Sequence, residues 1–344
     1  MFGARTVPGV DSSFQCGDEP SVPIRVAVSG AAGRVGYELV FPIASGGLFG
    51  PCRPVSLSLL DLPDRMHLLE ATRLELQDCA FPLLGDLRLS ADPAEAFADA
   101  DWIVLLAGAP LRFDGTARLD LVRQNGPIYA EHGQAINRVA ATARILVVAE
   151  PCNTNCLIAL KHAPDIPEER WFALNRLDRM RATAMIAQKA GVAVARVNRV
   201  TVWGNHSEKI YVDFHNSFID DRPAGQIITD PAWARDVLEP TVAKRERQIQ
   251  QLRGSTPAET AVQAILGTIR SISTPTPLRG RFGAAVISDG SYGVPRDLVC
   301  GLPLRTEDGL SWSIVEGLYL DEYAETRLAE NVEELEREAV VAGF

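Results

Sequence analysis

A histidine and a nearby aspartate–arginine pair could form a proton-transfer site. Asp178 and Arg181 are three residues apart, so on a helix they share a face. His206 follows a short apolar run and lies in the string WGNHS. If Asp178 lies beside His206, its carboxylate fixes the imidazole tautomer through Nδ1 and leaves Nε2 free for proton transfer. The alternatives are a solvated charge cluster around Asp178 and a structural role for the histidine.

Two arginines follow the apolar run at 102–107. Arg112 and Arg118 lie in a segment that predicts a loop, because it comes directly after a predicted buried strand. In open α/β folds, ligands bind at the carboxyl ends of the strands. The segment is therefore a candidate binding loop, and the alternative is a pair of surface arginines on a solvated loop.

A glycine-rich loop occurs early in the sequence. Gly30, Gly33 and Gly36 follow the β-branched run 24–28 and precede a helical pattern at 37–44. In this context the backbone N–H groups and the helix dipole can hold a pyrophosphate. The spacing GxxGxxG is one residue longer than the usual GxGxxG, and the alternative is a tight turn without a ligand.

Asp61 closes the second predicted strand, at 55–60. An acidic residue at this point accepts hydrogen bonds from the ribose hydroxyls of a dinucleotide. Leu62 and Pro63 follow, so no adjacent Lys or Arg is available to pair with a 2′-phosphate. The sequence therefore favours NAD over NADP, and the alternative is an exposed carboxylate at a strand end.

The elements around these residues predict an α/β protein. Strands alternating with helices in the first half predict a Rossmann-type doubly wound parallel sheet, followed by a mixed α+β substrate domain. We expect a flexible N-terminal arm at 1–22, an NAD-binding domain at 23–175 and a substrate/catalytic domain at 176–344. The predicted strands are 24–28, 55–60, 102–107, 144–149, 200–203, 284–287, 298–302 and 312–315, and the predicted helices are 37–44, 65–78, 231–253 and 323–341.

Composition excludes several classes of protein. The formal net charge of −10 argues against a nucleic-acid partner, which normally requires a basic surface. The sequence has no apolar run of about 20 residues, so we expect no membrane span. Six scattered cysteines without CxxC spacing predict reduced thiols in a cytoplasmic protein, and no metal site is expected.

Seven short strings together resemble the cytosolic-type malate dehydrogenases of the lactate/malate dehydrogenase family. They occur in the family's order, at similar intervals, and the similarity covers about residues 23–340. The strings are GAAGRVG at 30–36, ELQDCA at 75–80, RFDGTAR at 112–118, PCNTN at 151–155, RLDRMR at 176–181, GNHS at 204–207 and SDG at 288–290.

This resemblance implies hydride transfer between NAD and malate/oxaloacetate or a related small acidic 2-oxo or 2-hydroxy acid. It implies that His206 moves the proton and that Asp178 is its partner. Arg181 would hold the carboxylate beside the reacting carbon, since a guanidinium can donate two parallel hydrogen bonds to a carboxylate. Arg118 would polarise the substrate carbonyl, and Arg112 would hold the distal carboxylate.

The resemblance also implies a set of cofactor contacts, a homodimer and a place in the tricarboxylic acid cycle. The helix that contains 73–79 resembles the family's interface helix. The implied cofactor-binding residues are Gly30, Ala31, Ala32, Gly33, Arg34, Val35, Gly36, Asp61, Asn125, His132 and Val148.

Three positions depart from the family pattern. Glu150 replaces an asparagine that contacts substrate and cofactor, His132 replaces a glutamine, and Pro257 interrupts a serine-rich stretch. An ionised glutamate accepts hydrogen bonds but cannot donate them, so it opposes an anionic substrate. Burial favours the protonated form of Glu150 and the arginines favour the ionised form. The alternatives are a neutral substitution, a specialised reductase for another 2-oxo acid, or a cofactor-binding protein with lost or non-redox chemistry.

Overall fold

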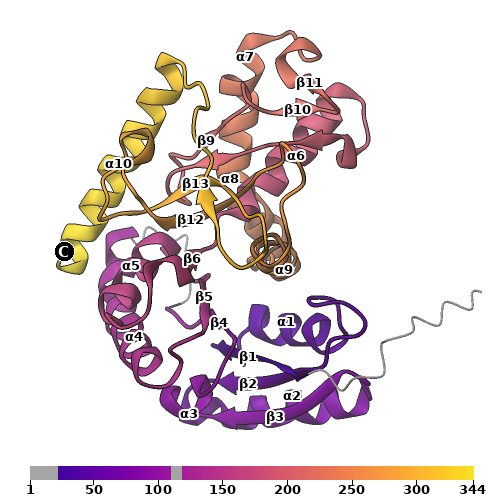
Figure 1. The fold of residues 1–344 in the computed structure, drawn as a ribbon, viewed down its shortest axis with the longest axis vertical. Coiled ribbons are helices and arrows are strands. Elements are labelled where there is room, and N and C mark those ends of the chain that lie inside the picture. Colours follow the sequence, from indigo (N-terminus) through magenta and orange to yellow (C-terminus); the bar gives the residue numbers. More distant parts are fainter. Residues whose placement is uncertain (1–21, 110–117) are drawn as a thin grey trace, which may run out of the picture.

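The computed structural model describes residues 22–109 and 118–344. Residues 1–21 of the predicted N-terminal arm and the segment 110–117, which contains Arg112, lie outside the described residues. Figure 1 shows a lower half built on the first strands and an upper half that contains the later ones.

The first half of the chain forms a parallel sheet in the order β3-β2-β1-β4-β5-β6. This order reverses direction between β1 and β4, which is where dinucleotide-binding sheets hold their ligand. Its strands are β1 (Ile24–Ser29), β2 (Val55–Leu60), β3 (Leu84–Ser90), β4 (Trp102–Leu105), β5 (Arg144–Val147) and β6 (Trp171–Ala173), and its helices are α1 (Arg34–Ala44), α2 (Met66–Asp78), α3 (Pro93–Phe97), α4 (Arg118–Val139) and α5 (Cys152–Lys161). The fold class predicted from the sequence is confirmed.

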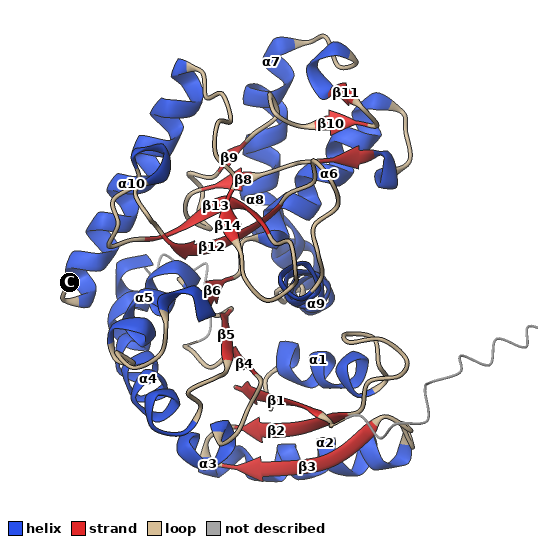
Figure 2. Cartoon of the chain, in the orientation of Figure 1, coloured by secondary structure: helices blue, strands red, loops and turns tan. Residues whose placement is uncertain are grey.

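The same sheet continues into the second half of the chain. Strand β12 (Phe282–Ile287) pairs antiparallel with β6, and β13 (Val299–Arg305) and β14 (Ser313–Ile314) extend it to nine strands. Figure 2 shows β6 at the boundary between the two halves, with β12, β13 and β14 above it in the upper half. The remaining main elements are α6 (Arg176–Ala190), β7 (Val197–Asn198), β8 (Val202–Trp203), β9 (Tyr211–Val212), β10 (Phe218–Ile219), β11 (Arg222–Pro223), α7 (Pro231–Trp233), α8 (Glu239–Arg253), α9 (Ala258–Ser273) and α10 (Glu322–Ala342).

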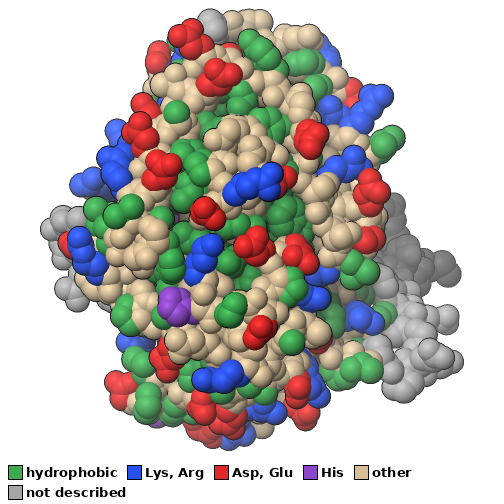
Figure 3. Space-filling model, turned by 60° about the vertical axis from the view of Figure 1, so that its left-hand side comes forward, with side chains coloured by type: hydrophobic (Ala, Val, Ile, Leu, Met, Phe, Trp, Pro, Cys, Tyr) green, Lys and Arg blue, Asp and Glu red, His purple; other side chains and the backbone are tan. Residues whose placement is uncertain are grey.

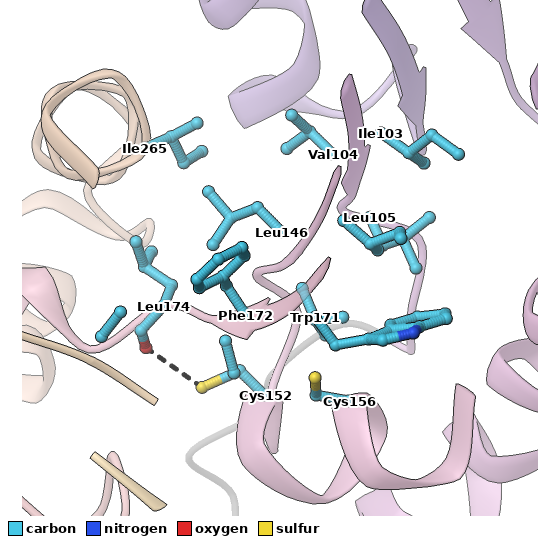
Figure 4. Close-up of a cluster of buried hydrophobic side chains, with 14 of the residues drawn as sticks. Ile103, Val104, Leu105, Leu146, Cys152, Cys156, Trp171, Phe172, Leu174 and Ile265 are labelled. Carbon is cyan, nitrogen blue, oxygen red and sulfur yellow. Dashed lines mark hydrogen bonds between the residues drawn. The ribbon is translucent and has the colours of Figure 1, made fainter. Parts of the chain in front are cut away.

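The core lies on the central strands β4, β5 and β6, which are apolar apart from Arg144 at the start of β5, because both faces of the sheet are covered. Figure 4 shows Leu146 between Val104 and Phe172, with Ile265 of α9 at the upper left. Cys152, at the start of α5, is buried below the sheet, and its thiol donates to the Leu174 carbonyl at 3.2 Å. The core therefore fixes the strand ends from which the candidate site is built.

Most predicted elements are present, with some differences at their ends. The strand at 55–60 matches β2, and the last predicted helix matches α10 within one residue at each end. The predicted helix at 231–253 is instead α7, a π-helical turn at Ala234–Leu238 and α8. Strand β3 and helices α4, α5 and α9 were not predicted, and Arg118, which was expected in a loop, is the first residue of α4. Strand β3 alternates apolar with polar residues at the edge of the sheet, where one side is exposed.

The cysteines differ from expectation at one position. Cys79, Cys152, Cys156 and Cys300 are free thiols. Cys52 is disulfide-bonded, so the prediction of reduced thiols is wrong there. Disulfide connectivity cannot be deduced from sequence alone, so nothing in the sequence singled out Cys52.

The surface carries charges of both signs. Acidic and basic side chains are interspersed on the face seen in Figure 3. Within 22–109 and 118–344, no helix is long and apolar enough to cross a membrane, and no cluster of His, Cys, Asp and Glu could hold a metal ion.

Candidate active site

A cleft of about 360 Å³ lies at the carboxyl ends of β1, β4, β5 and β6. It joins the glycine loop to the predicted catalytic histidine, two features that are far apart in the sequence. The lining residues are Gly30, Gly33, Arg34, Val35, Gly36, Leu106, Gly108, Ala109, Val148, Ala149, Glu150, Leu174, Leu177, His206, Glu246, Thr256, Pro257 and Ala261. Six of the predicted cofactor contacts therefore lie at the cleft, together with Pro257, one of the three departures from the family pattern.

The glycine loop requires glycine at two positions. Gly30 has φ +68°, and a Cβ there would lie 2.8 Å from the backbone nitrogen of Ala107. A Cβ on Gly36 would lie 2.6 Å from the Cα of Ala31, so this glycine lets α1 pack close to the loop. Gly33 precedes α1 without a side-chain cap, which leaves the first N–H groups of the helix available for an anion. The loop therefore fits the pyrophosphate of a dinucleotide.

Asp61 lies at the end of β2, beside this loop. Its carboxylate accepts hydrogen bonds from the backbone N–H groups of Ala32 at 2.8 Å and Leu62 at 2.9 Å. The side chain is nearly buried, at 9% exposure, and it links β2 to the glycine loop. An ionised carboxylate has further acceptor positions, which suit ribose hydroxyls.

Two further predicted cofactor residues lie behind the cleft wall rather than in it. Asn125 accepts from the Ala109 N–H and donates to the Glu150 carbonyl, both at 2.7 Å, so it ties together two lining segments. His132 packs against Phe97, with ring centroids 5.3 Å apart, and its Nδ1 lies 2.7 Å from the Ile128 carbonyl. Burial lowers the pKa of His132 to about 4, so the ring is neutral. The structure does not bring His132 to the cleft.

His206 and Asp178 lie together, as the sequence predicts. His206 Nδ1 forms a short hydrogen bond with the Asp178 carboxylate from the first turn of α6. His206 follows β8 after a sharp turn at Gly204, which has φ +88° and whose missing Cβ leaves room for the side chain of Asn331. This geometry fixes the imidazole orientation and directs Nε2 toward the cleft.

The Glu150 carboxylate interacts with the other ring nitrogen of His206. Its Oε1 lies 3.1 Å from His206 Nε2, and its Oε2 accepts from Arg118 Nη1 at 2.9 Å. Burial alone would raise the pKa of Glu150, but the charges of His206 and Arg118 lower it to about 2. Burial likewise disfavours the imidazolium, yet Asp178 and Glu150 hold the pKa of His206 well above its usual range. The charges of His206 and Arg118 therefore favour the ionised form of Glu150.

Arg118 is held by a network that sequence reasoning missed. Its Nε donates to Glu338 of α10 at 2.5 Å, and its Nη2 donates to Asn205 at 3.0 Å. Glu338 is fully buried and also accepts from Thr154. A faint signal for Glu338 existed in the sequence, because it follows Leu335 by three residues on the buried face of α10.

Arg181 lies on the Asp178 side of the site. Its Nη1 donates to Asp178 at 3.1 Å, and its Nη2 lies 3.5 Å from Glu246 of α8. Nε and Nη2 are buried and have no hydrogen-bond partner among the described residues. Such donors fit a carboxylate that enters the cleft. Burial raises the pKa of Glu246, a second acid that sequence reasoning missed.

Together, these features define a dinucleotide-binding oxidoreductase site: a glycine loop on a parallel sheet, a histidine at the cleft with its acidic partner, and two partly buried arginines that pair with the cleft carboxylates Glu150 and Glu246. The comparisons with known proteins agree. Residues 24–173 match the NAD-binding domain of lactate/malate dehydrogenases, and residues 175–341 match the α/β C-terminal domain of the same enzymes. The chain belongs to the lactate/malate dehydrogenase family, and it is an NAD-dependent oxidoreductase.

Individual relatives cover almost the whole chain. A malate dehydrogenase of Magnetococcus marinus is 43% identical over 316 residues, which is 92% of this chain and 96% of that protein. The crystal structure of malate dehydrogenase from Naegleria fowleri has a TM-score of 0.90 and 33% identity, and covers 94% and 99% of the two chains. The Trichomonas vaginalis lactate dehydrogenase in complex with NADH and oxamate has a TM-score of 0.88 and 31% identity, with 93% and 98% covered.

Proposed function

We propose that this protein interconverts a small acidic 2-hydroxy acid and the corresponding 2-oxo acid, with malate and oxaloacetate as the first candidates. The observation that carries the proposal is the His206–Asp178 pair at the cleft that begins with the glycine loop. Bound NAD supplies the hydride acceptor or donor. His206 holds the proton at Nε2 and gives it to the substrate oxygen during reduction, or accepts it during oxidation.

The arginines set the substrate class. Arg181 would hold the carboxylate next to the reacting carbon, because its buried Nε and Nη2 have no hydrogen-bond partner among the described residues, although Nη2 lies 3.5 Å from Glu246. Arg118 would stabilise the negative charge that develops on the substrate oxygen. Arg112, outside the described residues, would hold a second carboxylate. Three cations around one substrate favour a dicarboxylic acid.

The glycine loop and its surroundings would hold the cofactor. The pyrophosphate would lie on the N–H groups between Gly30 and Gly36, and Asp61 would accept from the adenosine ribose. Val148 would form part of the cleft wall. Asn125 would act indirectly, by fixing the segments at Ala109 and Glu150.

Broader assignments follow from the same proposal. Residues 23–175 would form the NAD-binding domain and 176–344 the substrate/catalytic domain, in a cytoplasmic homodimer. In the proposed interface helix, Leu74 is 51% exposed, which suits a covered position in a dimer. Malate as the substrate would place the reaction in the tricarboxylic acid cycle. A sedimentation experiment that finds only monomers at micromolar concentration would reject the dimer.

A second candidate function is the reduction of another 2-oxo acid, and Glu150 favours it. An ionised carboxylate bonded to both His206 and Arg118 opposes a second anion at the same place. A substrate with fewer negative charges would meet less opposition.

One assay separates the two candidates. NADH oxidation is followed through the absorbance of reduced nicotinamide. The substrates are oxaloacetate, pyruvate and longer 2-oxo acids, some with a second carboxylate and some without. We expect the highest kcat/KM for oxaloacetate. A preference for a monocarboxylic acid would favour the second candidate, and turnover with none of the acids would overturn the proposal.

A further inference from the structure

Both ring nitrogens of His206 are occupied by carboxylates of its own chain. Asp178 bonds Nδ1, and Glu150 Oε1 lies 3.1 Å from Nε2. An imidazolium has two N–H donors and no others. In this arrangement His206 therefore has no donor left for a substrate oxygen.

The other oxygen of Glu150 engages the second group that the reaction needs. Oε2 accepts from Arg118 Nη1 at 2.9 Å, while Glu338 and Asn205 accept from the remaining edges of the guanidinium. Glu338 and Asn205 are buried, so they hold Arg118 in place from behind. Glu150, with 20% of its side chain exposed, lies at the cleft and is the member of this set that can move.

We propose that Glu150 is a gating residue: its carboxylate clamps His206 to Arg118 in the substrate-free protein, and an anionic 2-oxo acid must exchange for it before hydride transfer. This inference rests on the proposed function. The incoming oxo and carboxylate oxygens take over the contacts with His206 Nε2 and Arg118 that Glu150 gives up. The proton stays on His206 through the exchange, so that it is ready to be donated.

Charged groups from five segments face the clamp. Asp178 and Arg181 come from α6, Glu246 from α8, Arg118 from α4, and Glu338 and Glu334 from α10, while Glu150 follows β5. Acids outnumber arginines among these groups. The clamp therefore costs an anionic substrate part of its binding energy, and its removal increases affinity more than it changes the chemical step.

The first arm of the test needs neither substrate nor cofactor. The ring nitrogens of ¹⁵N-histidine-labelled protein are titrated by NMR, and His206 is assigned with His206→Asn. In Glu150→Gln the side chain keeps its length but loses its charge. We expect the pKa of His206 to fall by at least one unit, a tenfold change in the protonation constant (about 1.4 kcal/mol). Glu246→Gln removes another cleft carboxylate that does not bond His206, and it should produce a smaller shift.

The second arm measures gating. Oxamate, an unreactive 2-oxo acid analogue, is titrated into NADH-loaded protein and followed by nicotinamide fluorescence. We expect Glu150→Gln to bind oxamate at least tenfold more tightly than wild type, and Glu246→Gln to change affinity less.

The outcomes are distinct. Equal His206 titrations in wild type and Glu150→Gln, or oxamate bound no more tightly by the variant, would overturn the gating proposal. The expected histidine shift without oxamate binding by any of the proteins would keep the clamp and reject a monocarboxylic 2-oxo acid, the second candidate, as the substrate.

Discussion

The cofactor end and the polar end of the cleft are built in different ways. At the cofactor end, Gly30 lies in the loop after β1, Gly36 lies in the first turn of the helix that follows, and Asp61 follows the neighbouring strand. At the polar end, Arg118, Glu150, Asp178, His206 and Glu338 come from five separate segments. A local motif can be recognised from spacing alone, whereas a charge network depends on which distant side chains the fold brings together.

The largest effect on turnover should come from replacing Asp178, the acid that orients His206 at the polar end of the cleft. Asp178→Asn removes the charge that stabilises imidazolium and favours the wrong tautomer, so turnover should fall by about 10²–10⁴-fold. NADH affinity should stay within a few-fold of wild type. Steady-state kinetics and a fluorescence titration measure the two quantities. Asp220→Asn, at an exposed pair with Arg196, is the control and should leave both unchanged.

At the cofactor end, a change at Gly30 should have an effect of comparable size, but on NADH affinity rather than on turnover. Gly30 has φ +68°, and Gly30→Ala places a Cβ against the backbone of Ala107. If the loop must take up about 3 kcal/mol of strain to keep the shape that binds the cofactor, NADH affinity falls roughly a hundredfold. Gly50→Ala is the matched control, because Gly50 has φ +95° with open space around it. NADH affinity unchanged in Gly30→Ala would show that the loop does not approach the cofactor.

The pH dependence should reveal the two carboxylates on His206. Since Asp178 and Glu150 hold the pKa of His206 well above its usual range, the imidazolium persists through neutral pH. Reduction, which needs the proton, should hold steady there and fall only at alkaline pH. Oxidation needs neutral imidazole, so its kcat/KM should rise by about tenfold per pH unit below that pKa. An oxidation rate that is already constant near pH 7 would contradict this assignment.

The smallest effect concerns cofactor choice. Asp61→Ser removes a charge that would face a 2′-phosphate, so the ratio of NADP to NAD affinity should rise by a few-fold to about tenfold. Asp64→Ser, at an exposed acid in the same segment, should leave the ratio unchanged. A stronger preference for NAD in Asp61→Ser would mean that Asp61 serves only to link β2 to the glycine loop.

The limits of sequence reasoning follow from the same contrast. β1 and β2 could be placed because short runs rich in apolar residues end at Gly30 and Asp61, and the pairing of His206 with Asp178 could be proposed from side-chain chemistry. Strand β3 was missed because its exposed edge carries polar residues. Glu338 was missed because its partner Arg118 is 220 residues away. The charge state of Glu150 depends on two distances that no sequence pattern contains.

The central claim is that His206 moves the proton at a cleft where NAD binds independently of it. The most direct measurement compares wild type and His206→Asn in oxaloacetate-dependent NADH oxidation, with NADH affinity determined on the same samples. The account predicts a loss of turnover of about 10²–10⁴-fold at nearly unchanged affinity. Turnover retained within a few-fold of wild type would contradict it.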